Sequence, residues 1–577
     1  MEEKDFYLSA LVDFPDDVIC GLTRRENLIE LFKKLKECNV KRIFWYYYGE
    51  AEDSYYKNFK MPNRTQIENM EKMLQDIPDY NKFAVETAHS LGMEIVGVMR
   101  TSESGDAAIF PEFYEVVRDY TEKCEISSIG GYLVTGNKYV MEHPESRIKR
   151  RTFDIDEAAE NKNICKIELR KQNDIPTRIK KENIKIYVSD NNYNYREFKG
   201  DFNFEISTAI CEDDVWVVAG APYVRKRISK KGETVSTVIL SGFEIKEQYV
   251  AVACNCGALY DPENTETAFK NALSKAIYCY ADDGTPIPVT VGNEPKVWRI
   301  NDGTNWKESG LAFDDGFGNY FEFQLDSTDK EGVYGVARGK NRYVHSHLCE
   351  CDEGVQKYWF EALENCLNNG FDMITSREEN HSIMINDPFA FGYNDSIKEK
   401  YFEVYGKCEE KDMDPQKIAK IRGDVYSQLF IEGAKKVRES GKKVALQLNL
   451  EMLHDPIPLD RIFAYPMNVE WQWRRWIDEI KPDEVVIRTF CYMPEFVFSD
   501  PQSMEIINAA KVLNVPMTYE RYIDKGDFIK DYTTVKNTGI FDSITLYETC
   551  GAFGFDKNGN LFERNPEFIK ALKELTQ

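Results

Sequence analysis

The stretch FDMITSREENHSIMINDPFAFG, residues 371–392, decides how the chain is interpreted. It begins with a short apolar run, residues 371–374, which follows a helix-like segment at 358–370. The run ends in five polar residues, Arg377, Glu378, Glu379, Asn380 and His381. In an α/β barrel the buried strands are apolar, and chemistry collects at their C-terminal ends. The stretch therefore predicts a barrel strand with functional side chains at its end, and the alternative is a solvated loop between two helices.

Seven further segments have the same form, an apolar run that ends in polar or aromatic residues. They are residues 6–14, 42–50, 93–100, 442–453, 483–495, 515–522 and 543–551. Amphipathic helical segments separate them, and the alternation of strand and helix predicts a parallel sheet with right-handed crossovers. Three strands come before the middle of the chain and five come after it. The sequence therefore predicts the α/β class and an interrupted (β/α)8 TIM barrel.

The middle of the chain follows a different pattern. From about residue 165 to 254, short alternating runs such as NIKIYVSD and VWVVAG are separated by turn residues, which predicts an antiparallel β insert. The run NIKIYVSDNNYNYREF, residues 183–198, resembles the galactose-binding-like jelly rolls of many carbohydrate enzymes. We expect four parts: the first part of the barrel at 1–160, a β-sandwich insert at 161–256, a strand-rich connecting segment at 257–340, and the second part of the barrel at 341–577.

Composition restricts the partners of the protein. A net charge of −24 and a pI near 4.9 argue against nucleic acid, whose binding uses clustered Lys and Arg. The sequence has neither a basic, apolar leader nor an apolar stretch of membrane-spanning length, so we expect a cytoplasmic protein. The 14 cysteines lack the spacing of a disulfide scaffold. The pairs Cys254/Cys256 and Cys349/Cys351 lack the matching half site of a structural zinc centre.

Seven segments outside the β insert resemble the glycosyl-hydrolase-like proteins of the family-10 type. They are HPESRIKRR (143–151), GVARGKN (335–341), SREENHS (376–382), NDPFAFGYNDSIKEKYFEVYG (386–406), KIAKIRGDVYSQLF (417–430), WQWRRWIDEIKPDEVVI (471–487) and LYETCG (546–551). The resemblance implies a TIM barrel and action on glycosidic bonds.

Five glutamates at predicted strand ends are the catalytic candidates: Glu378, Glu379, Glu451, Glu520 and Glu548. In clan A glycosidases the acid/base lies at the end of strand four and the nucleophile at the end of strand seven. Glu378 or Glu379 and Glu520 occupy those places here, although Asn380 follows the glutamates where those enzymes have Asn before the acid. Two carboxylates about 5 to 5.5 Å apart act with retention, and a wider gap gives inversion. Glu451 or Glu548 could replace either of them.

Eight other side chains at the strand ends suit contacts with a sugar: Arg377, Asn380, His381, Tyr46, Tyr47, Asn449, Arg488 and Tyr492. Polar groups among them would bond hydroxyls, and the aromatic rings would stack on a sugar face, with core packing as the alternative. His381 could equally be a metal ligand or an ordinary loop histidine.

These observations predict an intracellular carbohydrate-active enzyme that hydrolyses small oligosaccharides or glycosides without a cofactor. The first alternative is a sugar isomerase, epimerase or lyase in which Glu378, His381, Glu451, Glu520 and Glu548 hold a divalent cation. The second is a noncatalytic carbohydrate-binding protein. A small carbohydrate is the expected partner, and neither a membrane nor a nucleic acid is; the sequence leaves the oligomeric state open.

Overall fold

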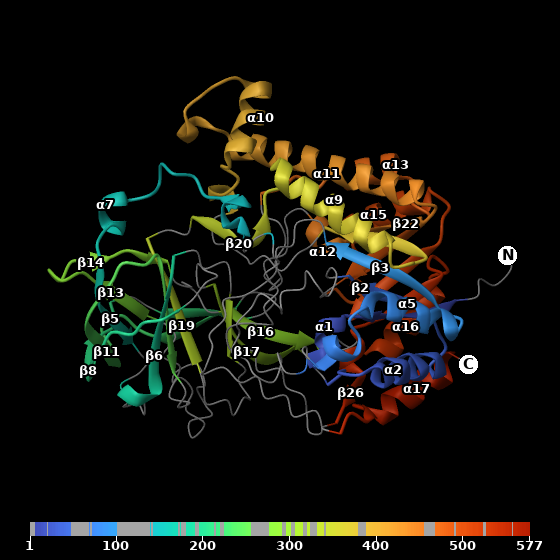
Figure 1. Cartoon of the computed structure of the whole chain (residues 1–577), viewed down its shortest axis with the longest axis horizontal. Helices are drawn as coiled ribbons and strands as arrows, with labels where there is room; N and C mark the ends of the chain where they lie inside the picture. Colours follow the sequence, from blue (N-terminus) through green and yellow to red (C-terminus); the bar gives the residue numbers. More distant parts are fainter. Residues whose placement is uncertain are drawn as a thin grey trace.

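The computed structural model contains an α/β barrel and a separate group of β-sheets (Figure 1). It describes residues 6–19, 21–47, 69, 72–100, 139, 142–170, 174, 180–190, 196–212, 215–219, 224–254, 276–290, 296–301, 306–314, 320–323, 332–339, 342–378, 388–454, 468–489, 492–522, 527–556 and 558–576.

Eight strands close into one barrel, and each is parallel to both of its neighbours. In order around the barrel they are β1 (Tyr7–Val12), β2 (Val40–Tyr46), β3 (Glu94–Arg100), β21 (Met373–Arg377), β22 (Lys443–Asn449), β23 (Glu484–Thr489), β24 (Met517–Tyr522) and β25 (Ser543–Tyr547). Three of them precede the other sheets in the chain and five follow. The predicted α/β barrel is confirmed.

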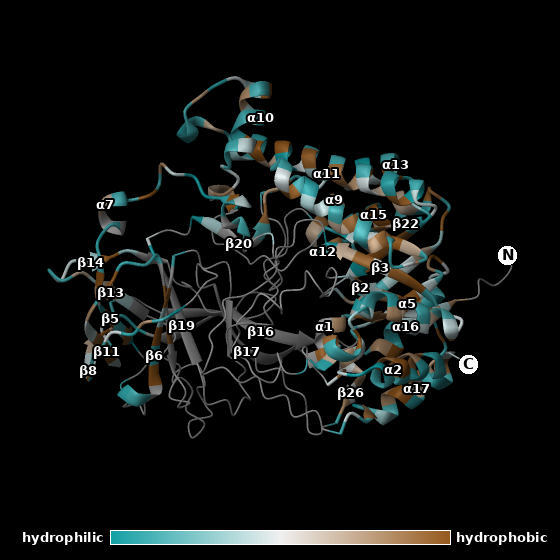
Figure 2. Cartoon of the chain, viewed as in Figure 1, coloured by the Kyte–Doolittle hydropathy of each residue, from teal (hydrophilic) through white to brown (hydrophobic). Residues whose placement is uncertain are grey.

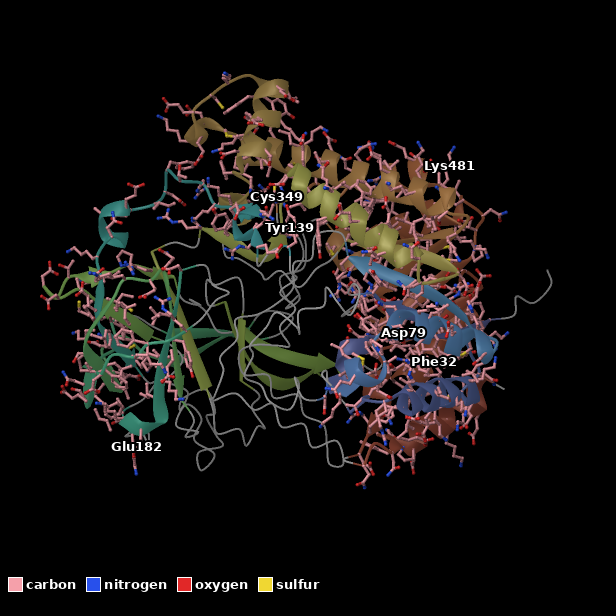
Figure 3. The ribbon with its side chains drawn as sticks, viewed as in Figure 1. Phe32, Asp79, Tyr139, Glu182, Cys349 and Lys481 are labelled. Carbon is pink, nitrogen blue, oxygen red and sulfur yellow. The ribbon has the colours of Figure 1, made fainter. Side chains whose placement is uncertain are left out.

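Helices cover the outside of the barrel (Figures 1 and 2). The main ones are α2 (Arg25–Glu37), α5 (Tyr80–Ser90), α9 (Glu353–Leu367), α11 (Pro415–Glu439), α13 (Trp473–Ile480), α15 (Pro501–Lys511), α16 (Phe528–Asn537) and α17 (Pro566–Thr576). Each is amphipathic; in α2, for example, Leu28, Leu31, Phe32 and Leu35 are buried in the core cluster that also contains strand residues. Figure 3 labels Phe32 of this helix. Within the described residues, no helix combines the length and the apolar content that crossing a bilayer requires.

Four further helices occupy the loops and the outer edge of this layer. They are α1 (Phe14–Ile19), α10 (Asp395–Tyr405), α12 (Leu450–Leu453) and α14 (Pro494–Val497). In Figure 1, α10 projects beyond the rest of the helical layer.

The strands between residues 164 and 338 form three five-stranded sheets beside the barrel. The first contains β5 (Ile164–Arg170), β8 (Asn203–Ile210), β11 (Thr234–Ile245), β13 (Ala276–Tyr280) and β14 (Pro286–Ile287). The second contains β6 (Ile184–Ser189), β7 (Arg196–Glu197), β12 (Tyr249–Cys254), β15 (Val289–Thr290) and β19 (Gly332–Arg338). The third contains β9 (Val215–Ala219), β10 (Val224–Ser229), β16 (Lys296–Asn301), β17 (Trp306–Asp314) and β18 (Tyr320–Phe323).

The pairing in these sheets has two features that bear on the boundaries of the insert. All described pairs are antiparallel except β9 with β16, which is parallel. The segment expected to connect, 257–340, supplies strands to all three sheets; β13 pairs with β5, for instance, and β19 with β12. The β-structure therefore continues across the expected boundary at residue 256.

A two-stranded antiparallel ribbon, here called the neck, joins the sheets to the barrel. It pairs β4 (Arg147–Lys149), which leads into the insert, with β20 (Tyr343–Leu348), which leads out. Beside it, Arg422 of α11 donates from Nε to Oε1 of Glu350 at 2.5 Å and from Nη2 to Nε2 of His347 at 3.2 Å. These three side chains are buried, so the neck is tied to the helical layer by an ion pair. Figure 3 labels Cys349 and Tyr139 in this region.

Candidate active site

The barrel interior changes from apolar to polar towards the C-terminal ends of the strands. Side chains alternate along a strand, so every second residue faces inward. The middle of the interior is an apolar cluster that includes Leu11, Phe44, Val96, Met373, Ala445 and Val486. The inward positions beyond it, here called the mouth layer, hold Tyr46, Arg377, Gln447, Arg488, Glu520 and Tyr547, each at most 3% exposed. The layer lies where a TIM barrel carries its active site.

Glu520 of β24 is the centre of the mouth layer. Its Oε1 accepts hydrogen bonds from Nη2 of Arg377 at 2.6 Å and from Nε2 of Gln447 at 3.2 Å. Nε of Arg488 forms an ion pair with the same oxygen at 2.7 Å. Its Oε2 is buried and has no hydrogen-bond partner among the described residues. One oxygen of the carboxylate is thus fixed by three groups, and the other is left for a further partner.

Tyr547 of β25 connects the two guanidinium groups. Its hydroxyl accepts from Nη1 of Arg377 and from Nη2 of Arg488, both at 3.2 Å, and lies 3.1 Å from the hydroxyl of Tyr46. The Arg377 guanidinium also stacks over the Tyr46 ring, 4.4 Å from its centre. Burial raises the pKa of Tyr547 to about 12, so the hydroxyl keeps its proton at neutral pH.

Glu378 follows directly after β21, beside the mouth layer. Its Oε1 accepts the backbone N–H of Asn449 at 2.5 Å, and its buried Oε2 has no hydrogen-bond partner in the described part of the chain. Burial raises the pKa of this carboxyl, while the Asn449 N–H and the charges of Arg488 and Arg377 oppose the rise. A buried carboxyl with a raised pKa suits the role of proton donor.

Two of the other glutamates have different surroundings. Oε1 of Glu451 accepts the backbone N–H of Tyr492 at 3.0 Å, so this carboxylate holds the loop after β23. Glu548 is half-buried beside Tyr547, whose pKa its charge helps to raise. Asn449 caps α12 by accepting the N–H of Met452 at 3.3 Å.

The aromatic candidates lie in different parts of the barrel. Tyr46 faces the mouth layer, but Tyr47 and the residue that precedes Tyr46, Trp45, face the opposite side because side chains alternate along the strand. Nε1 of Trp45 donates to Asn81 of α5 at 2.8 Å, and Tyr47 contacts Phe371 edge to face in the core beneath the helices. The ring of Tyr492 packs against His454 and Phe496, outside the mouth layer.

Three candidates, Glu379, Asn380 and His381, lie outside the described residues, and so does Cys256. In the described part, no group of three or more His, Cys, Asp or Glu side chains is arranged to hold a metal ion. Cys349 and Cys351 are buried free thiols.

Gln447 and Tyr547 belong to the mouth layer, although sequence reasoning did not select them. The alternation of side chains was the available signal, because Tyr547 is two residues beyond the inward Thr545 and Glu520 is two beyond the inward Thr518. The same rule places Arg521 outside the barrel, where its Nε donates to Asp531 of α16 at 2.9 Å.

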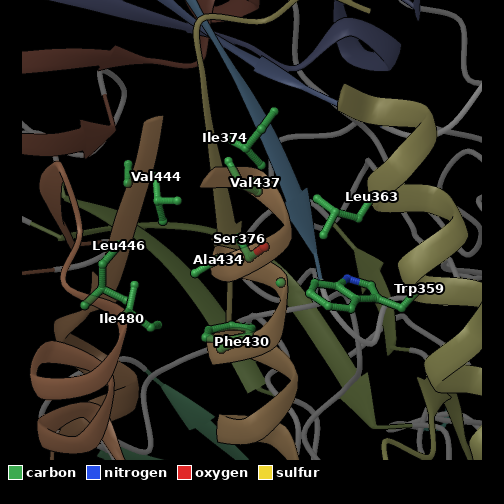
Figure 4. A pocket seen from close by; sticks show the side chains of 12 residues that line it. Trp359, Leu363, Ile374, Ser376, Phe430, Ala434, Val437, Val444, Leu446 and Ile480 are labelled. Atoms are coloured by element: carbon green, nitrogen blue, oxygen red, sulfur yellow. The ribbon is translucent and has the colours of Figure 1, made fainter. Parts of the chain in front are cut away.

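A small cavity lies between α9, α11 and the barrel strands (Figure 4). It measures about 30 Å³, which is room for about one water molecule. Its lining is mainly apolar, with Trp359 and Leu363 of α9, Phe430 and Ala434 of α11, and Leu446 of β22. The cavity is a packing gap behind the strands and is separate from the mouth layer.

No family model and no curated protein sequence matches the chain. One similar solved structure is pyruvate kinase from Pyrobaculum aerophilum, with 8% identity and a TM-score of 0.29, covering 100% of this chain and 74% of that one. Another is an inactive double mutant of MUTB, with 8% identity and a TM-score of 0.27, covering 90% of this chain and 57% of that one. Similarity at this level carries no argument about fold or activity.

Proposed function

We propose that the protein hydrolyses the glycosidic bonds of small oligosaccharides or glycosides with Glu378 as proton donor and Glu520 as nucleophile or base. The observation that carries the proposal is the surroundings of Glu520. Arg377, Arg488 and Gln447 all contact one of its oxygens, and the other is buried without a hydrogen-bond partner among the described residues. A carboxylate held in this way at the C-terminal end of a barrel strand is suited to meet a substrate.

In this mechanism Glu378 gives its proton to the glycosidic oxygen as the bond from that oxygen to the anomeric carbon breaks. A water molecule supplies the new oxygen at the anomeric carbon. Its proton passes to Glu520 in a single displacement; in a double displacement Glu520 first forms a glycosyl ester, and the water then hydrolyses the ester with help from Glu378. The raised pKa of Glu378 supports its role, because a proton donor must hold its proton until the bond breaks.

We also propose that the first two sheets form the galactose-binding-like jelly roll. Alternating apolar residues are buried along β5 (Ile167 and Leu169) and in β12 (Val250 and Val252). This alternation supports a sandwich in which the two sheets share one core.

The test is release of the aglycone from a panel of small aryl glycosides by the wild type, Glu378→Gln and Glu520→Gln. Glu484→Gln is the matched control, because Glu484 is as buried as Glu520 but lies at the N-terminal end of the barrel. We expect Glu378→Gln and Glu520→Gln each to lower kcat roughly 10²- to 10⁴-fold. The control should retain kcat per folded molecule.

The products are identified by proton NMR. Reducing sugar supports hydrolysis, and the anomer formed first distinguishes retention from inversion. A wild type that releases no aglycone, or two mouth variants that remain fully active, would refute the proposal. An unsaturated product would indicate a lyase.

A further inference from the structure

We propose that Oε2 is the atom of Glu520 that meets the substrate, and that Tyr547 is the positioning residue that keeps the carboxylate in this orientation. The inference rests on the proposed function, because it assigns parts within the same site.

The two oxygens of Glu520 have different surroundings. Terminal carboxyl torsions are broad, so a glutamate side chain alone does not fix the direction of either oxygen. Here Arg377, Arg488 and Gln447 all contact Oε1, from three different strands. Because no described residue bonds Oε2, the contacts hold the carboxylate with that oxygen directed away from its partners. Oε2 is therefore the atom that remains for the anomeric carbon or for a water proton.

The hydroxyl of Tyr547 takes part in three hydrogen bonds with described residues. A guanidinium group only donates, so the Tyr547 oxygen uses both lone pairs to accept from Arg377 and Arg488. It has no lone pair left to accept from Tyr46, 3.1 Å away, and in that contact Tyr547 must be the donor. The hydrogen bonds thus run from the guanidinium groups to Tyr547 and from Tyr547 to Tyr46.

The Tyr547 hydroxyl therefore binds the guanidinium groups of both Arg377 and Arg488. Each guanidinium has one nitrogen on Tyr547 and another on Glu520. Loss of the Tyr547 hydroxyl removes one of these two attachments from both arginines at once. Arg377 would keep its hydrogen bond from Nε to Oε1 of Gln447 at 2.9 Å, so the two guanidinium groups would be held less firmly, and the Glu520 carboxylate would lose part of its fixed orientation.

The experiment compares Tyr547→Phe with Tyr519→Phe, its matched control. Tyr519 is also fully buried and precedes Glu520, but its ring packs outside the barrel against Phe498 and Phe541. We expect Tyr547→Phe to lower kcat roughly 10- to 100-fold, the loss of a hydrogen bond to a charged group, with KM within about twofold. Tyr519→Phe should leave both constants within about twofold.

Glu520→Gln is assayed in parallel so that the two proposals can fail separately. If Glu520→Gln is inactive and Tyr547→Phe keeps its kcat, the role of Tyr547 is refuted and the proposed function stands. Equal losses in both tyrosine variants would also refute it, because they would reflect general packing. A fully active Glu520→Gln would overturn the proposed function and the inference together.

Gln447→Met is the second variant, for use if Tyr547→Phe fails to fold. It keeps the approximate size of the side chain and removes one donor from Oε1. We expect a smaller loss, roughly 3- to 10-fold in kcat with unchanged KM. An unchanged kcat in Gln447→Met would refute the view that contacts on Oε1 orient the carboxylate.

Discussion

The two ends of the barrel interior both hold a buried arginine and glutamate network, and they differ in how completely the carboxylate is bonded. At the N-terminal end, Nη1 of Arg42 lies 2.6 Å from Oε1 and 2.5 Å from Oε2 of Glu484, and Thr518 donates to Oε1 at 2.6 Å. At the C-terminal end, the described contacts of Glu520 all fall on one oxygen. Buried polar atoms normally have partners. The complete network therefore stabilises the fold, whereas the incomplete one lies in the candidate site.

The largest expected effect on stability is at the N-terminal end. Arg42→Met should lower the free energy of unfolding by about 3 to 5 kcal/mol, because Glu484 would remain buried without its cation. The measurement is urea unfolding at pH 7, with the exposed Lys443→Met as control. A loss below about 1 kcal/mol would contradict a structural role for this network.

A smaller effect on the free energy of unfolding is expected at two threonines that face the interior on neighbouring strands. The Thr518 hydroxyl donates to Glu484, whereas the Thr545 hydroxyl has no hydrogen-bond partner among the described residues. Thr518→Val should cost about 1.5 to 3 kcal/mol, and Thr545→Val should be neutral or slightly stabilising. Urea unfolding of the two variants, side by side, checks the difference. Equal losses would remove the distinction between bonded and unbonded polar groups on which the comparison rests.

A third effect is a pH dependence at the mouth. Burial raises the pKa of Glu378 above its usual 4.5, so the folded protein binds this proton more tightly than the unfolded chain does. Its contribution to stability is fully present below pH 4.5 and is lost as the pH rises through the folded-state pKa. Glu378→Gln cannot ionise, so its unfolding free energy should match that of the wild type near pH 4 and exceed it increasingly at higher pH.

Denaturant titrations at several pH values test this expectation. Glu432→Gln, an exposed position on α11, is the control and should show a constant difference from the wild type. A difference for Glu378→Gln that shrinks as the pH rises would contradict the raised pKa.

The smallest expected effect is that of a chelator. If Glu520 acts through its own oxygen, a chelator should change the turnover of small glycosides by less than about twofold. The assay is aglycone release before and after dialysis against chelator, with added divalent ion as the reverse arm. Activity that disappears with chelator and returns with the ion would favour the metal-dependent isomerase, epimerase or lyase.

The sequence predicted the barrel because each strand carries its own local signal. Residues 371–377, for example, are an apolar run after an amphipathic helix, and they form β21 almost as expected. The sheets beside the barrel had no such signal for their partners. Ala276 of β13 pairs with Arg170 of β5 across more than 100 residues, and only the folded structure reveals such pairing.

The candidate site could be predicted only in part, for a related reason. Strand ends identified Arg377, Arg488 and Glu520, which do meet in the mouth layer. They also offered Glu451 as a replacement for either principal carboxylate, and its carboxylate holds a loop. A shift of one residue reverses the direction of a side chain, so the composition of a strand end does not tell which residues enter the barrel.

The neck has a consequence for the order of folding. Arg100 of β3 pairs with Arg377 of β21. The barrel therefore closes only when these two strands meet, although the whole β insert lies between them in the sequence. Once β4 has paired with β20, only residues 101–146 and 349–372, about a quarter of the intervening length, remain outside the neck. Two halvings of a flexible loop reduce the entropy cost of its closure by about 1.2 kcal/mol. An insert that folds early would therefore hasten closure of the barrel, and the first three strands would wait during synthesis for the remaining five.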